Sequence, residues 1–134
     1  MEAKKKHLWA MVVILIIIAG GLFWWHAPVN MTHIEPEEVS KIKIFDGNTG
    51  KPTIIIEPDD IKHIIENLNK VSLKKEKISM GYMGYSFRVT IYIGDNIYKE
   101  FYINSEDTIR KDPFFYHDIS RSIDYDFIKE LIEN

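Results

Sequence analysis

The segment Asp46–Glu57 (DGNTGKPTIIIE) approaches the spacing of a known ion-binding motif. Its oxygen-bearing side chains fall at positions 1, 3 and 12 of a calcium-binding loop: Asp46, Asn48 and Glu57. Position 5 is Gly50, which has no side-chain oxygen, and position 6 is Lys51, where the loop requires glycine. The flanking residues alternate as strands do. We therefore predict a hairpin loop here and no metal site.

A second group of candidate residues lies on a predicted β-hairpin formed by Tyr85–Ile93 and Ile97–Asn104. A three-residue loop at 94–96 would place apolar side chains on one face and a tyrosine-rich set on the other. That set is the candidate partner surface: Arg88, Tyr92, Tyr98 and Tyr102. Tyr and Arg are enriched at binding hot spots, although cross-strand tyrosine pairs also stabilise a sheet that binds nothing.

The other polar residues show no catalytic or cofactor-binding pattern. The five histidines lack the i, i+4 spacing of a helical zinc site, and the chain has no cysteine, nucleophile elbow or phosphate-binding glycine loop. Asp59 and Asp60 precede an apolar helical stripe, where acidic residues cap a helix. We therefore expect no enzyme, no cofactor and no metal, with an enzyme of unrecognised type as an alternative.

The elements that would carry these residues follow a long apolar segment, Leu8–Trp25, which has no charged residue. As a helix it would span about 27 Å, close to the hydrocarbon thickness of a bilayer. The predicted membrane-interface anchors are the basic and aromatic residues near its ends: Lys4, Lys5, Lys6, Trp9, Trp24 and Trp25. The lysines predict a cytoplasmic N-terminus and a C-terminal domain outside the cell.

A cleaved signal peptide is the competing interpretation of this segment. Ala19, Gly20 and Gly21 are small residues that suit cleavage near Gly21, which would release a secreted effector or inhibitor. Because Leu22–Trp25 continues the apolar run past that point, we favour a retained anchor.

Downstream of the anchor, the hydrophobic pattern predicts an α+β domain: a small antiparallel sheet, in the order β-β-α-β-β-β-α, with helices packed on one face. The expected elements are strands at 39–45, 53–57, 71–78, 85–93 and 97–104, a possible short strand at 114–119, and helices at 58–70 and 122–133. Lys74, Lys75 and Lys77 indicate that 71–78 is a solvated edge strand. The expected divisions are a basic tail at 1–7, a transmembrane helix at 8–25, a linker at 26–38 and the domain at 39–134.

The composition narrows the class of partner. The chain has 17 Lys and Arg against 20 Asp and Glu, without a basic stripe, so we expect no nucleic acid as a partner.

Four stretches of the chain carry a resemblance to a known group of proteins: the lysine-rich start with the apolar span, the DGNTGKPTIIIEPDDIKHIIENL segment, the YSFRVTIYI/IYKEFYIN hairpin and the terminal IDYDFIKELI. They resemble small uncharacterised membrane-anchored extracytoplasmic proteins of Gram-positive bacteria. The resemblance implies a location and a fold, and no catalytic residue.

These observations predict a single-pass protein of the cell membrane. Its outward domain is expected to be a binding module. The expected partners are the lipid bilayer and an envelope protein or small ligand.

Overall fold

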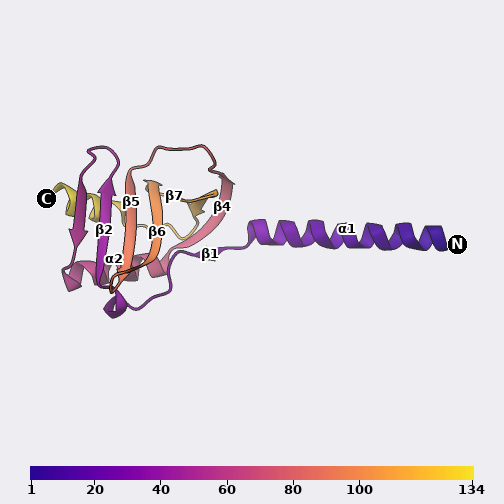
Figure 1. Ribbon diagram of the computed structural model, residues 1–134, viewed down its shortest axis with the longest axis horizontal. Helices are drawn as coiled ribbons and strands as arrows, with labels where there is room; N and C mark the ends of the chain where they lie inside the picture. The colour runs from indigo at the N-terminus through magenta and orange to yellow at the C-terminus, as the bar shows by residue number, and fades with distance from the viewer.

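The computed structural model describes all 134 residues, and its first element is a long helix, α1 (Glu2–His26). None of its residues is buried, and the helix is long and apolar enough to cross a membrane. It projects from the rest of the molecule as a separate rod (Figure 1). The predicted apolar helix is confirmed, and it extends beyond Leu8–Trp25 to include the lysines of the expected tail.

The remainder of the chain is built on one curled antiparallel sheet of eight strands. The strands are β1 (Val29–Asn30), β2 (Lys41–Asp46), β3 (Pro52–Ile55), β4 (Ser72–Ile78), β5 (Phe87–Ile93), β6 (Asn96–Ser105), β7 (Thr108–Lys111) and β8 (Phe114–Asp118). Their order across the sheet is β1-β4-β8-β7-β6-β5-β2-β3. The α+β class is confirmed, but the expected strand order omitted β1 and β7 and gave β8 only as a possible short strand.

Two helices, α2 (Pro58–Lys70) and α3 (Tyr125–Glu133), lie behind the sheet in Figure 1, and a short 3-10 helix, η1 (Pro36–Glu38), precedes β2. The apolar stripe of α2 is buried as its spacing predicted: Ile61, Ile64, Ile65 and Leu68. Ile128 of α3 joins them and the inward side chains of β2, β5 and β6 in one core. Both helices therefore cover one face of the sheet and leave the outer face without a helix.

The two helices of the domain are capped differently at their N-termini. Asp124 caps α3, because its side chain accepts a hydrogen bond from the Phe127 amide at 3.3 Å. The expected cap of α2 at Asp59 or Asp60 is wrong. Glu57 is the N-cap residue, and both aspartates lie within the first turn, where their charge still suits the helix dipole.

The β5–β6 hairpin has the predicted register over most of its length, with Arg88 opposite Tyr102 and Val89 opposite Phe101. Beyond Ile91 the prediction is wrong. Gly94 adopts a φ of 58°, which permits a tighter turn than the expected three-residue loop. A bulge then absorbs one residue, so Tyr92 pairs with Ile97 instead of Tyr98, and the buried faces stay aligned.

The expected linker at 26–38 belongs largely to the folded domain. Val29 and Asn30 form β1 by pairing with the start of β4, and Met31, Thr32 and Ile34 are buried. Only residues 27 and 28 separate α1 from the sheet. The helix α1 is therefore joined closely to the edge of the domain.

Candidate functional site

The outer face of the sheet carries a continuous row of aromatic and arginine side chains, which we call the outer row. Its members, in order of contact, are Arg88, Phe45, Tyr85, Tyr102, Arg110 and Tyr82. They come from β2, β5, β6, β7 and the connection between β4 and β5. The row exists because the sheet places β2, β5, β6 and β7 side by side.

The spacing within the outer row is that of tilted aromatic pairs and cation–π contacts. The Arg88 guanidinium lies 4.9 Å from the centre of the Phe45 ring, and the Tyr85 and Tyr102 ring centres are 4.9 Å apart. Arg110 lies 4.1 Å from the centre of the Tyr102 ring. Such contacts hold planar groups in fixed positions at little entropic cost, which suits a recognition surface.

The connection between β4 and β5 covers one end of the outer row. The Tyr82 carbonyl accepts a hydrogen bond from Nη1 of Arg110, and the Gly84 carbonyl accepts one from the side-chain amide of Asn104 at 3.0 Å. Arg110 is thereby almost fully buried. These bonds hold the segment Gly81–Tyr85 against the sheet.

The structure brings together only part of the predicted partner surface. Arg88 and Tyr102 face each other across β5 and β6 and belong to the outer row. Tyr92 lies apart from them, with Nζ of Lys41 4.6 Å from its ring centre. Tyr98 is the additional residue of the bulge. Sequence reasoning missed Phe45 and Arg110, which only the strand order places beside Arg88 and Tyr102.

The loop that partly matched a calcium motif is a tight β2–β3 turn. The Asp46 carboxylate accepts a hydrogen bond from the Asn48 amide at 2.8 Å. Burial raises the pKa of Asp46, but hydrogen bonds from Asn48 and Thr49 outweigh burial and hold that pKa below its ordinary value. Glu57 lies beyond β3 at the start of α2. No group of three or more metal-ligating side chains is present in the molecule.

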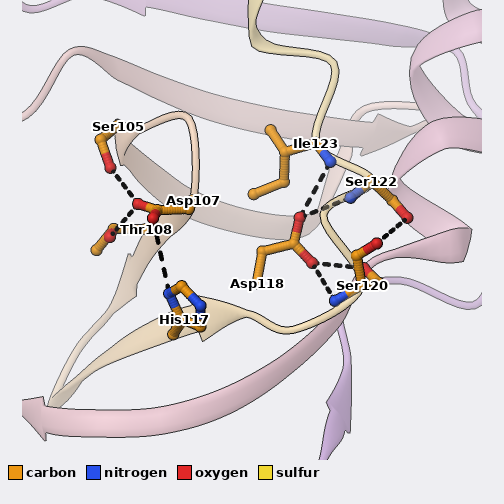
Figure 2. A network of polar contacts seen from close by, with 8 residues as sticks. All are labelled: Ser105, Asp107, Thr108, His117, Asp118, Ser120, Ser122 and Ile123. Atoms are coloured by element: carbon orange, nitrogen blue, oxygen red, sulfur yellow. Dashed lines mark hydrogen bonds and ion pairs between the residues drawn. The ribbon is translucent and has the colours of Figure 1, made fainter.

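A polar network at the turn between β6 and β7 is the arrangement that most resembles a catalytic site (Figure 2). Asp107 accepts hydrogen bonds from the hydroxyls of Ser105 at 2.9 Å and Thr108 at 3.0 Å, and His117 lies 3.9 Å away. These hydroxyls, with the charge of His117, hold the pKa of Asp107 below its ordinary value. The Ser105 hydroxyl donates its hydrogen bond to the Asp107 carboxylate and not to His117. Ser105 therefore lacks the hydrogen bond to a histidine that activates a serine nucleophile.

The second carboxylate in Figure 2, that of Asp118, organises the segment that leads into α3. It is fully buried and accepts hydrogen bonds from the amides of Ser120, Ser122 and Ile123 and from the Ser120 hydroxyl. A buried carboxylate surrounded by amide donors is electrostatically satisfied. Asp118 therefore fixes the backbone of this segment.

The remaining histidines are scattered over the molecule. His26 ends α1, and His33 is exposed in the segment after β1. His63 on α2 lies 2.9 Å from the Asp124 carboxylate and stacks on the Phe127 ring at 3.7 Å between ring centres. His63 thus joins the two helices.

Residues at the end of α1 contact the sheet directly. The rings of Trp24 and Trp25 each lie 5.7 Å from that of Phe114 on β8. Lys75 on β4 donates a hydrogen bond to the Trp24 carbonyl at 3.2 Å, and its ammonium lies 4.2 Å from the centre of the Trp24 ring. The expectation that Lys75 is solvated is therefore wrong, because the end of α1 buries it.

Comparison of the chain with protein family models, curated proteins and solved structures finds no match.

Proposed function

We propose that this protein is a single-pass membrane protein whose extracytoplasmic domain binds another envelope protein through the outer row. The observation that carries the proposal is the combination of a wholly unburied apolar helix with a sheet face that no helix covers. An apolar helix without a protein partner is stable in lipid. The lysines before the span support an outward domain. The resemblance to membrane-anchored proteins of Gram-positive bacteria agrees with this placement.

The outer row suits a protein partner better than a small ligand. Its residues form a row along an open sheet face, and none of them lines the cavities beside Lys99 or beside Pro58. Small ligands are bound in concave sites, whereas tyrosine and arginine on open surfaces anchor protein interfaces. Arg88 is partly exposed and ends the row opposite the covered end, so its guanidinium can pair with an acidic or aromatic group.

Site-specific photo-cross-linking in the native cells tests this proposal. Benzoylphenylalanine would replace Glu100, an exposed residue two positions before Tyr102 on the outer face, and, as a control, Glu66 on α2. We expect a discrete cross-linked species from position 100 that is absent from position 66. Arg88→Ala should remove most of that species, and Arg88→Lys should restore only part of it, because lysine keeps the charge but not the planar group.

Equal cross-linking from positions 100 and 66, or no effect of Arg88→Ala, would remove the outer row from consideration. Arg88 is a better probe than Tyr102. Tyr102 is packed between Tyr85 and Arg110, so its removal also lowers stability.

A further inference from the structure

A cavity of about 180 Å³ opens on the inner face of the sheet, beside the end of the anchor helix. Its apolar wall includes Met31, Leu73 and Ile109, and its polar groups include Lys99, Lys111 and Tyr116. The helices α2 and α3 cover the other part of this face. The cavity is distinct from the outer row, which lies on the opposite side of the sheet.

The two lysines of this cavity have no acidic partner. None of the ion pairs in the molecule includes Lys99 or Lys111. Asp112 also borders the cavity, but its carboxylate accepts a hydrogen bond from the Ser79 hydroxyl at 2.7 Å and lies 3.9 Å from Nε of Arg110. Two cations face this space, and the one carboxylate there is engaged by Ser79 and Arg110, so the cavity keeps a net positive charge.

Lys99 is the more constrained of the two. Its ammonium donates one hydrogen bond, to the Met31 carbonyl, and so has further N–H donors available. Burial, with the charge of Lys111, lowers its pKa. Burial also raises the pKa of Tyr116, whose hydroxyl therefore stays protonated and can donate to an anion. A bound anion would relieve the repulsion between the two ammonium groups.

We propose that this cavity binds an anionic phosphate or carboxylate group that carries a short apolar substituent. The lysines and Tyr116 would hold the anion, while Met31, Leu73 and Ile109 would contact the substituent. The volume is below the roughly 300–1,000 Å³ of sites for drug-sized ligands, so the occupant is small or is the head of a larger molecule.

Two sources of this chemistry are compatible with the position of the cavity. Phe114, whose ring centre is 6.2 Å from that of Tyr116, contacts Trp24 and Trp25 at the end of α1. If α1 spans a bilayer, the cavity lies beside the membrane surface and an anionic lipid headgroup could enter it. A soluble organic phosphate or acid could enter from the aqueous side.

The experiment uses the full chain in nanodiscs of phosphatidylcholine, with hexyl phosphate as the probe. We would measure acetylation of each lysine by mass spectrometry and binding by calorimetry. Hexyl phosphate should protect Lys99 but not Lys51, and hexanol, which lacks the charge, should protect neither. Lys111→Met should weaken binding about ten-fold or more, and Lys51→Met, an exposed charge-matched control, should leave it unchanged.

A second arm distinguishes the sources. Nanodiscs that contain phosphatidylglycerol, with no added hexyl phosphate, should protect Lys99 if a lipid is the occupant. Unchanged reactivity there would assign the site to a soluble anion. Absence of protection by hexyl phosphate, or equal weakening by Lys51→Met, would overturn the proposal. The hexyl phosphate arm does not depend on the outer row, so its failure would be distinct from failure of the proposed function.

Discussion

Replacing Asp118 should destabilise the domain far more than replacing any other acidic residue of Figure 2. Asp118 is fully buried and accepts hydrogen bonds from the amides of Ser120 at 3.0 Å, Ser122 at 2.8 Å and Ile123 at 3.1 Å. A hydrogen bond to a charged group contributes about 1.5–3 kcal/mol, and bonds to one carboxylate are not additive. We therefore expect Asp118→Ala to lower the free energy of unfolding by about 3–5 kcal/mol.

Asp118→Asn tests the same argument with almost no change of shape. One carboxylate oxygen accepts from Ser122 and Ile123 and the other from Ser120, so the amide nitrogen of asparagine would face N–H or O–H donors on one side. We expect a loss of about 2–3 kcal/mol. Asp107→Asn is the matched control, because that carboxylate is exposed and surface substitutions change stability by about 0.5 kcal/mol.

The assay is urea unfolding of the full chain in detergent micelles, followed by near-ultraviolet circular dichroism. All seven tyrosines lie in the domain, so the tyrosine part of this signal reports on its tertiary packing. Asp118→Asn with a free energy of unfolding within about 0.5 kcal/mol of the natural chain would refute the assignment of Asp118 as the organiser of this segment.

Two further predictions concern the turns. Gly47→Ala would bring a Cβ far inside contact distance of the Tyr85 carbonyl and should lower the free energy of unfolding by about 2 kcal/mol or more. Gly50 has a φ of 73° but open space around it, so Gly50→Ala should lower the free energy of unfolding by about 1 kcal/mol. Equal effects of the two substitutions in urea unfolding would contradict this ranking. Because the pKa of Asp107 is lowered in the folded state, its stabilisation is present above its ordinary pKa of 3.8 and is lost as the pH falls through the folded value. The stability difference between the natural chain and Asp107→Asn should therefore shrink from pH 6 to pH 3, and a constant difference would contradict it.

Periodicity explains which elements of the fold could be predicted. The apolar stripe of α2 repeats over two helical turns, and the central β5–β6 register follows from strict alternation of apolar and polar residues. Only one helix face and one strand register bury these apolar residues, so both could be predicted. The two residues of β1 and the four of β7 are too short to carry a period. Neighbouring strands hold β1 and β7 in the sheet, so their own residues do not reveal that they are strands.

The candidate sites were only partly predictable for a related reason. Arg88 and Tyr102 face each other across adjacent strands, so alternation could place them together. Arg110 and Asp118 are charged residues that are almost completely buried. Because charged residues are mostly exposed, residue type alone predicts the opposite for both. The burial of Lys75 depends on where the end of α1 packs, and no property of β4 by itself indicates that contact.

The central claim is that α1 crosses a membrane and places the domain outside the cell. The chain has no cysteine, so a single introduced cysteine is a unique label. Glu130→Cys on α3 and Ala3→Cys near the start of α1 are both exposed. In intact cells we predict that a membrane-impermeant maleimide labels full-length, membrane-bound Glu130→Cys, and that it labels Ala3→Cys only after permeabilisation. Labelling of Ala3→Cys alone in intact cells, or a shortened Glu130→Cys product in the medium, would contradict the account.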